Sequence, residues 1–339
     1  MDFSSDTSAP AHPAVIEALA KANEGQAGSY GADAMTLALE ARLKSLFETD
    51  DLAIWPTASG TAANALALSC ICPPTHSILC HVDAHIEQDE RGAPEFFTGG
   101  AKLDLLPGID GKIAPETLSA HLDTVDEGFV HVVPPAALSL TNLTEWGTTY
   151  TPGELRTLAD LAHQKGLNVH LDGARFANAL AHLGASPAEL SWKADIDVLT
   201  LGLTKTGAMG CEIIVFFGSA KKTLMALRAR AKRSGHMPPK LRYISAQGLA
   251  LLEDDLWLNL AAHANSMAQA VSQRILAFPG AALITPVQGN EVFVHLPSEL
   301  AAKLSDAGWK YYPWPGGGYR FVCAWSTRPE DIDAAFSAL

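Results

Sequence analysis

The sequence lacks the features that direct a chain into a membrane, along the secretory route or onto nucleic acid. No run of about 18 consecutive apolar residues occurs, so a membrane-spanning helix is not expected. Residues 1–6 are acidic and polar, unlike a secretion signal. The formal net charge of −13 disfavours binding to nucleic acid or anionic lipid. We therefore expect a cytoplasmic protein that has neither a membrane nor a nucleic acid as a partner.

Cysteine is rare and shows no pairing pattern. The five residues are Cys70, Cys72, Cys80, Cys211 and Cys323. Their number is odd, and no two of them form a CxxC pair. Because most of them stand within apolar runs, we interpret them as buried structural thiols in a reducing compartment.

Several common catalytic motifs are also missing. His81 and His85 stand four residues apart, but the glutamate of a helical HExxH zinc motif is absent, so no metal site is expected. Segment 57–61 lacks the first glycine of a GxSxG hydrolase elbow. No GxGxxG follows an early strand, and we interpret the glycines at 316–318 as a turn because a strand follows them.

The sequence does contain a regular alternation of strand-like and helix-like segments. Strands are predicted at 54–57, 78–82, 102–106, 129–133, 138–141, 167–172, 197–201 and 212–217. Helices are predicted at 14–22, 35–47, 59–69, 152–165 and 175–183, with a long helical stretch at 244–276. This alternation is typical of an α/β fold in which helices cover both faces of a mostly parallel sheet.

A chain of 339 residues is expected to form about two domains. Residues 1–243 would form a large domain that contains this sheet and the N-terminal segment. Residues 244–339 would form a smaller α+β domain. The basic segment 228–240 is interpreted as the connection towards the smaller domain, or as the source of a phosphate ligand for a neighbouring subunit.

One lysine and one aspartate stand where two strands are expected to end. Lys205 follows the apolar run 198–203, and a poorly solvated lysine can attack a carbonyl group. Asp172 ends the strand 167–172, and the chain between the two residues accommodates one helix and one strand. Both side chains can then lie at the same end of adjacent parallel strands. Taken alone Lys205 could be a solvated loop residue, but together the pair suits the imine and pyridinium ends of pyridoxal phosphate (PLP).

Two further positions are consistent with a phosphorylated cofactor. Ser59, Gly60 and Thr61 open an alanine-rich helix, where free N–H groups, hydroxyl groups and the helix dipole converge. A phosphate would fit there, and an ordinary serine cap is the alternative. His85 is either a flat ring that stacks on a cofactor or a buried, hydrogen-bonded histidine.

In their order these signals resemble a known family. The sequence is similar to fold-type I PLP enzymes and, among them, to the L-threonine aldolase (β-eliminating lyase) family. The resemblance extends over almost the whole chain, and its main segments are 5–6, 30–31, 59–64, 90–97, 170–179, 204–205 and 320–321. The segments around Glu90, Asp172 and Lys205 most resemble the bacterial low-specificity enzymes.

The resemblance implies which residues hold the PLP cofactor. Lys205 would bond to its aldehyde carbon, Asp172 would keep its pyridine nitrogen protonated, and His85 would stack on its ring. The remaining contacts would come from the helix start and from arginines, namely Ser59, Gly60, Thr61, Arg175 and Arg233.

The resemblance also implies an amino-acid substrate and an active site shared between subunits. Ser5, Arg175 and Arg320 would bind the substrate carboxylate, the arginines through charge-assisted hydrogen bonds. Tyr30 resembles a tyrosine that enters the site from the adjacent subunit, and Arg233 would reach the phosphate in a similar way. We therefore expect at least a homodimer, and a tetramer of two tight dimers.

One position departs from the family. Many members have Thr-His-Asn-Gly before the helix that precedes the aspartate strand, whereas this chain has Thr144-Glu145-Trp146-Gly147. The histidine is thought to contact the side chain or hydroxyl group of the substrate. The β-substituent and the threo/erythro preference therefore do not carry over to this chain.

The activity implied by the resemblance is cleavage of L-threonine, L-allo-threonine and related L-β-hydroxy-α-amino acids to glycine and an aldehyde. The base for the β-hydroxyl proton is left open between His85 and a water held by His85, Glu90 or Glu145. Two alternatives share the fold: an aldolase for phenylserine and other bulky substrates, and a PLP-dependent β-eliminating lyase. An aldolase without PLP, using Lys205 or the pair His81 and His85, is an alternative of a different class.

Overall fold

A seven-stranded, mostly parallel sheet forms the centre of the molecule, as the sequence predicted. The computed structural model describes residues 1–126 and 128–337. Along the chain the strands of this sheet are β1 (Leu52–Thr57), β2 (Ser77–His81), β3 (Lys102–Leu106), β4 (Pro135–Thr141), β5 (Asn168–Gly173), β6 (Val198–Gly202) and β7 (Glu212–Phe217). They lie in the order β1-β7-β6-β5-β4-β2-β3. β7 is antiparallel to β1 and β6, and the other neighbouring pairs of the sheet are parallel.

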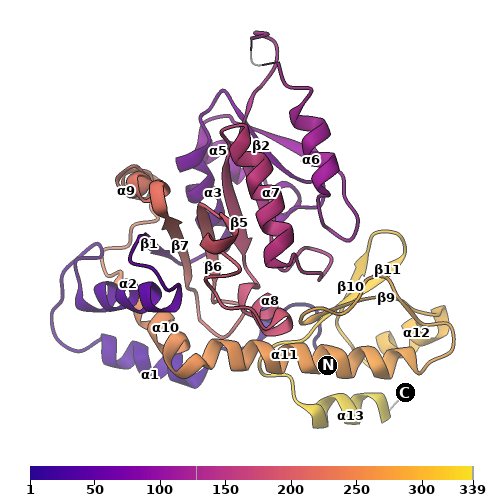
Figure 1. The fold of residues 1–339 in the computed structure, drawn as a ribbon. Coiled ribbons are helices and arrows are strands. Elements are labelled where there is room, and N and C mark those ends of the chain that lie inside the picture. The colour runs from indigo at the N-terminus through magenta and orange to yellow at the C-terminus, as the bar shows by residue number, and fades with distance from the viewer. Residues whose placement is uncertain (127, 338–339) are drawn as a thin grey trace.

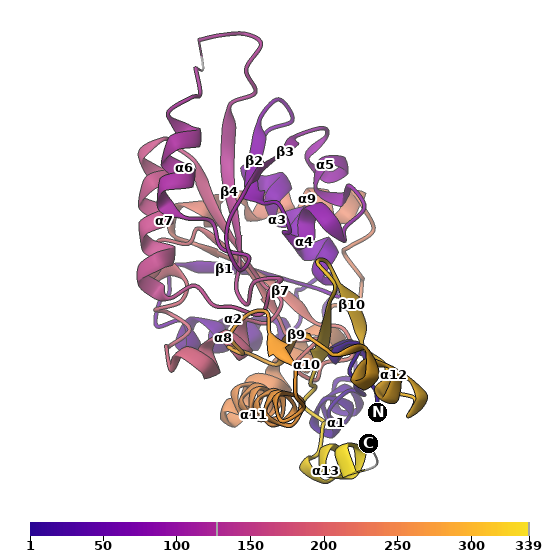
Figure 2. The same cartoon turned by 90° about the vertical axis from the view of Figure 1, so that its right-hand side faces the viewer.

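Helices cover both faces of this sheet (Figures 1 and 2). One face carries α3 (Gly60–Ile71), α5 (Ala93–Thr98) and α9 (Leu224–Arg233). The opposite face carries α6 (Pro115–Leu122), α7 (Pro152–Gln164) and α8 (Phe176–Leu183). The start of α7 follows from its sequence, because Thr151 and Glu154 satisfy each other's backbone N–H groups in a capping box before Pro152 continues the helix.

The predicted helical stretch 244–276 is broken in the structure. It forms α10 (Arg242–Leu252), the short turn η4 (Glu253–Asp255) and α11 (Leu256–Leu276). Asp254 and Asp255 have φ values of 47° and 55°, a left-handed backbone that a helix cannot contain. The expectation of one long helical stretch was therefore wrong at this turn. The break lets α10 pack on α1 (Pro13–Ala22) and α2 (Ala34–Leu46), while α11 continues to the second domain (Figure 1).

The predicted strand at 129–133 is also wrong, because this segment forms turns. Phe129 and Val130 are 54% and 88% exposed. Their residue types favour a strand, but a strand needs a partner. Neighbouring β2 and β5 begin opposite Pro135 and Ala137 of β4, so residues 129–133 lie beyond the edge of the sheet.

A smaller domain contains a four-stranded antiparallel sheet in the order β10-β11-β9-β8. Its elements are β8 (Ala282–Leu283), β9 (Glu291–His295), α12 (Ser298–Asp306), β10 (Tyr312–Trp314), β11 (Gly318–Val322) and α13 (Pro329–Ser337). Its apolar cluster is separate from that of the large sheet. α11 joins the two clusters, since Trp257 belongs to the first and Val271 to the second. Phe3, from the N-terminal segment, also packs in the second cluster.

The remaining helical segments are short: η1 (Asp6–Ser8), α4 (His85–Gln88), η2 (Trp192–Ala194) and η3 (Gly218–Thr223). Four cysteines are buried and Cys70 is half-buried, and all five are free thiols. Burial raises the pKa of each thiol. A raised pKa is typical of a buried structural cysteine, in agreement with the interpretation from the sequence. Of the helices in the described part of the chain, none is both long and apolar enough to cross a bilayer.

Candidate active site

The carboxyl ends of β2, β4, β5 and β6 meet at one edge of the large sheet, here called the carboxyl edge. Asp172 on β5 pairs with Thr141 at the end of β4. Beyond these ends the chain continues to His85 after β2, to Glu145 after β4 and to Lys205 after β6. In open α/β sheets ligands bind outside this edge. The structure thus brings together four predicted site residues from four different loops and strands.

Asp172, His85 and Glu90 form the centre of the site. One side-chain nitrogen or carboxylate oxygen atom from each of the three residues lies within 4.8 Å of the corresponding atoms of the other two. The distance from His85 Nδ1 to Glu90 Oε1 is 2.8 Å. Asp172 and Glu90 are buried, whereas the His85 side chain is 39% exposed. An exposed ring beside two buried carboxylates can face a bound ligand.

Asn64 on α3 joins the two carboxylates. Its Nδ2 donates to Asp172 Oδ2 at 2.7 Å and to Glu90 Oε1 at 2.9 Å. The backbone N–H of Ala174 donates to Asp172 Oδ1 at 2.9 Å. Sequence reasoning assigned no role to Asn64. A signal did exist, because an amide among the buried alanines and leucines of α3 needs a partner.

Glu145 ties the loop after β4 to the start of α4. Its Oε1 accepts hydrogen bonds from the backbone N–H of His85 at 2.7 Å and from Thr141 Oγ1 at 2.9 Å. Its Oε2 is buried and has no hydrogen-bond partner among the residues that the structure describes. One oxygen of Glu145 is therefore left for a ligand.

Burial and neighbouring groups raise the pKa values of Glu145, Glu90 and His85. Burial raises the pKa of Glu145 to about 7, and the Asp172 charge adds to this rise. Burial also raises the pKa of Glu90. Burial lowers the pKa of His85, but the Glu90 hydrogen bond and the Asp172 charge outweigh it, so the net shift is upward. A carboxyl group with a pKa of about 7, such as that of Glu145, can exchange protons with a substrate at physiological pH.

Lys205 lies in a loop that is bonded to the start of β7. The N–H of Leu203 donates to the carbonyl of Cys211 at 3.1 Å, and the N–H of Cys211 donates to Thr204 Oγ1 at 3.1 Å. Lys205 itself is half-buried. Its charge acts on His85 and on Asp6, so the amine lies within electrostatic reach of the centre.

Two arginines reach the site from different domains. Arg175 caps α8, and Arg320 lies on β11. Arg175 Nε donates to Asp6 Oδ2 at 2.8 Å, and its Nη2 donates to Asp6 Oδ1 at 3.2 Å. Glu291 Oε1 lies 3.4 Å from Arg175 Nη2 and 3.8 Å from Arg320 Nη1. Sequence reasoning missed both acids, because only the fold brings residues this far apart in the chain together.

The predicted substrate ligand Ser5 is occupied within its own turn. Its Oγ lies 2.8 Å from Thr7 Oγ1 and accepts from the N–H of Thr7 at 3.2 Å. The neighbouring carbonyl of Ser4 accepts from Arg320 Nη2 at 3.5 Å. The structure therefore brings the segment of Ser5 to the arginines, with Asp6 rather than Ser5 in contact with Arg175.

The start of α3 presents free backbone N–H groups. Ser59 is exposed and caps the helix, its Oγ accepting from the N–H of Ala62 at 3.2 Å. No atom lies within 4 Å of the position that a Cβ would take on Gly60. Gly210 of the lysine loop lies nearby, since a Cβ there would be 3.2 Å from the carbonyl oxygen of Ala58. This open helix start beside the lysine loop suits a phosphate group.

Tyr30 and Arg233 are not brought to this centre within one chain. The N–H of Tyr30 donates to the carbonyl of Pro239 at 3.0 Å, and Lys232 Nζ lies 4.3 Å from its ring centroid. Tyr30 is 37% exposed. Arg233 is exposed at the last turn of α9. Neither side chain makes a hydrogen bond to Asp172, His85 or Lys205 in the described part of the chain.

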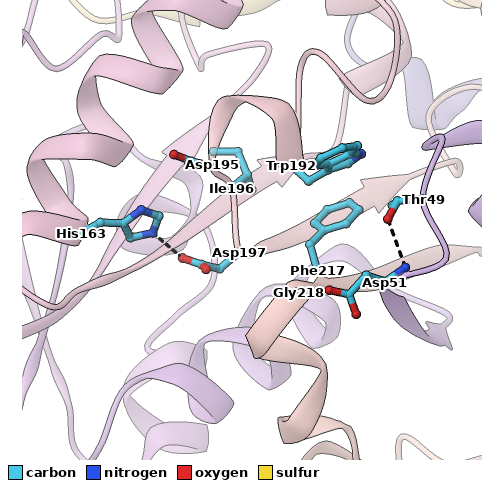
Figure 3. Close-up of a pocket in the computed structure, with 9 residues that line it drawn as sticks. All are labelled: Thr49, Asp51, His163, Trp192, Asp195, Ile196, Asp197, Phe217 and Gly218. Atoms are coloured by element: carbon cyan, nitrogen blue, oxygen red, sulfur yellow. Dashed lines mark hydrogen bonds and ion pairs between the residues drawn. The ribbon is translucent and has the colours of Figure 1, made fainter.

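A cavity of about 400 Å³ lies at the opposite edge of the sheet, where β1 and β6 begin (Figure 3). It contains none of the predicted site residues. His163 Nε2 lies 2.8 Å from Asp197 Oδ2, and Asp195 pairs with Arg156 at 3.0 Å. Because its carboxylates already have cationic partners, we assign the active site to the carboxyl edge instead.

Comparison with known proteins shows the family of the chain. The sequence model of the beta-eliminating lyase family matches residues 2–299. The chain is 41% identical to a low specificity L-threonine aldolase of Pseudomonas sp. (strain NCIMB 10558), covering 99% of this chain and 98% of that protein. It is 40% identical to the corresponding protein of Pseudomonas aeruginosa, over 97% and 94% of the two chains. Among solved structures, a threonine aldolase of Leishmania major matches with a TM-score of 0.91 and 27% identity, over 99% and 97% of the two chains.

Proposed function

Because the chain belongs to the beta-eliminating lyase family, we propose that it is a PLP-dependent aldolase. It has the fold-type I architecture that the sequence predicted. Its reaction breaks the Cα–Cβ bond of L-threonine, L-allo-threonine and related L-β-hydroxy-α-amino acids, giving glycine and an aldehyde. The observation that carries the proposal is the convergence of Lys205, Asp172 and His85 at the carboxyl edge of a chain 41% identical to a threonine aldolase.

The residues of the carboxyl edge fit PLP. Asp172 is a buried carboxylate that two donors hold in place, as a partner for a pyridine N–H must be. The exposed ring of His85 suits stacking, and the open start of α3 suits the phosphate. Lys205 is the amine that would bond to the aldehyde carbon. Bound PLP withdraws electrons from the substrate Cα, which makes cleavage of the Cα–Cβ bond possible.

The side chains around the cofactor site bind the substrate and move its protons. Arg320 binds the substrate carboxylate and so orients the bonds of Cα. Glu145 Oε2, or a water held by His85 and Glu90, takes the β-hydroxyl proton while the Cα–Cβ bond breaks. Trp314 links the two groups, because it packs against Trp146, the neighbour of Glu145, and lies 5.3 Å from the Arg320 guanidinium.

Product analysis tests this proposal. Purified protein with PLP is supplied with L-threonine and L-allo-threonine, and the products are identified. Glycine and acetaldehyde in equal amounts are expected. A 2-oxo acid and ammonia would instead indicate β-elimination, and no product from any β-hydroxy-α-amino acid would contradict the proposal.

Phenylserine is a second candidate substrate, favoured by the rings beside Arg320. The Arg320 guanidinium lies 5.3 Å from the ring centroid of Trp314 and 5.4 Å from that of Tyr312. Trp146, next to Glu145, packs edge-on against Trp314 at 5.5 Å. An aryl β-substituent could pack on this group of rings. A higher kcat/KM for phenylserine than for L-threonine would support this substrate.

We also propose that the enzyme is a cytoplasmic homo-oligomer of at least two chains, and a tetramer of two dimers. The exposed positions of Tyr30 and Arg233 support this, because both are free to extend into the site of a neighbouring chain. Sedimentation at working concentration tests the oligomeric state, and a monomer with full activity would contradict the shared site.

A further inference from the structure

The two arginines of the site differ in how completely they are bonded. Arg175 donates two hydrogen bonds to Asp6, and Asn290 Nδ2 supports that carboxylate at 3.0 Å. Arg320 makes one long hydrogen bond, to the carbonyl of Ser4 at 3.5 Å. Its Nε is buried and has no hydrogen-bond partner in the described part of the chain. Arg320 therefore keeps donors for a ligand carboxylate, whereas Arg175 is largely committed to Asp6.

Glu291 is a buried carboxylate between these two arginines. Its side chain is 1% exposed, and Oε1 lies 3.4 Å from Arg175 Nη2 and 3.8 Å from Arg320 Nη1. Neither of its oxygens has a hydrogen-bond partner within residues 1–126 and 128–337. Glu291 thus acts on the arginines through its charge and not through directional bonds. The position of Arg320 is fixed by β11 and by the rings of Tyr312 and Trp314.

The charges of this group cancel. Two guanidinium groups face the carboxylates of Asp6 and Glu291, so these four side chains together offer an incoming carboxylate no net positive charge. A buried like charge beside an anion site opposes binding of the anion. Burying the Glu291 carboxylate without hydrogen-bond donors is unfavourable for the stability of the fold. A contribution to stability alone therefore does not explain Glu291.

We propose that Glu291 is a counter-charge that weakens the binding of the amino-acid carboxylate at Arg320. The inference rests on the proposed function, since it takes the ligand to be an amino acid. Substrate and glycine carry the same carboxylate, so tight binding of this group would stabilise substrate, transition state and product alike. Such uniform binding lowers KM without raising kcat and delays release of glycine. By weakening carboxylate binding, Glu291 keeps small the binding free energy that substrate, transition state and product share.

Glycine binding to the holoenzyme tests the proposal without turnover. Glycine is titrated into wild-type protein and Glu291→Gln, and the visible absorbance of the bound cofactor gives Kd. We expect glycine to bind the variant on the order of tenfold more tightly. Glycinamide, which lacks the carboxylate, should bind both proteins alike. The matched control Glu299→Gln removes an exposed charge on α12 of the same domain and should leave Kd unchanged.

An unchanged or weaker glycine affinity in Glu291→Gln would overturn the proposal, as would equal tightening of glycinamide. If that variant does not fold, Glu291→Met removes the same charge and carries the same expectation. Glu291→Asp retains the charge and should keep a Kd close to wild type. In steady-state assays with L-threonine, Glu291→Gln should show a lower KM with no increase in kcat. A failure of the proposed function would show separately, as absence of aldehyde release by the wild-type enzyme.

Discussion

Glu145 is a carboxylate whose two oxygens have different surroundings. Oε1 accepts two hydrogen bonds, and Oε2 is buried without a partner among the described residues. Burial raises its pKa to about 7. Protonated, it can donate one hydrogen bond; ionised, it can accept the β-hydroxyl proton of a substrate. The residue thus combines the position and the protonation state that a catalytic base requires.

The first prediction concerns the pH dependence that Glu145 confers. Its ionised form accepts the proton, so kcat/KM should rise as pH increases through about 7. Glu145→Gln should lower kcat/KM by about 10²-fold or more and lose this rise. Rates of aldehyde release between pH 5.5 and 8.5 would be measured, with exposed Glu116→Gln as the control. A variant that keeps the rise at pH 7 would exclude Glu145 as its source.

Asp6 supplies the second prediction, which concerns stability. Burial raises the pKa of Asp6, but the charges of Arg175 and Lys205 and the hydrogen bonds from Arg175 and Asn290 together outweigh burial, so the net shift of the pKa is downward. A lowered folded-state pKa means that the ionised pair stabilises the protein above the unfolded pKa of about 3.9. That stabilisation is lost as pH falls through the folded-state value. Asp6→Asn should therefore lower the free energy of unfolding at pH 7 by about 3 kcal/mol.

Urea unfolding of wild type and Asp6→Asn at several pH values measures this difference. It should shrink as pH falls below about 4, because the wild-type carboxyl group then also becomes neutral. A difference that stays constant down to the acid transition would show that the charge of Asp6 is not what stabilises the fold.

At the scale of elements, α3 carries two parts of the site. Ser59 caps its first turn, and Asn64 reaches from its buried face to Asp172 and Glu90. The same helix therefore carries the proposed phosphate-binding end and holds Asp172, the proposed partner of the pyridine nitrogen. Its position is fixed by packing against β5, β6 and β7.

The third prediction separates the two roles considered for Ser59. Ser59→Ala removes a cap hydrogen bond and should lower the free energy of unfolding by about 1 kcal/mol. If Ser59 also binds the phosphate, the Kd for PLP should rise by roughly tenfold. Both quantities would be measured on protein reloaded with PLP after dialysis. Loss of stability with an unchanged Kd would leave Ser59 as a helix cap alone.

The strand ends at the carboxyl edge could be predicted because the sequence patterns that indicate them are local. Lys205 and Asp172 each follow an apolar run, and the parallel topology alone places the ends of such runs together. The break at Asp254 and Asp255 could not be read in this way, because apolar spacing continues on both sides of it. The strand predicted at 129–133 was wrong for a different reason. Strand-forming residues remain unpaired when no neighbouring strand extends to them.

The hydrogen-bond and ion-pair partners of the site residues could be predicted from the sequence only in part. The resemblance supplied His85 and Glu90, and Glu145 was noticed as a departure from it, but the hydrogen bonds among these residues were not predicted. Asp6 and Glu291 meet the arginines through contacts between the N-terminal segment, the large domain and the small domain. Such pairs depend on the packing of distant segments, and no spacing in the sequence encodes them.

At the scale of the whole molecule, the site lies where the two domains meet. Asp172 lies on the large sheet, Lys205 and His85 lie in segments that follow its strands, and Arg320 and Glu291 lie on the small sheet. The N-terminal segment joins both, since Phe3 packs in the small domain and Asp6 binds Arg175. Relative movement of the domains would therefore change the carboxylate site directly.

The fourth prediction tests the shared active site of the oligomer. Lys205→Ala and Tyr30→Ala should each have little activity as separate proteins. If Tyr30 acts in a neighbouring chain, subunits exchanged between the two variants should form hybrids with one intact site. Aldehyde release would be compared before and after exchange, with differently tagged chains to verify hybrid formation. Hybrids without recovered activity would show that Tyr30 serves the site of its own chain or none.

Reduction of the PLP-loaded enzyme with borohydride, followed by peptide mass analysis, tests the central claim most directly. Borohydride fixes the bond between a lysine amine and the PLP aldehyde as a stable amine. We expect the visible absorbance to disappear and one lysine, Lys205, to carry the added pyridoxyl phosphate mass. Label on another lysine, or an active enzyme that acquires no label, would contradict it.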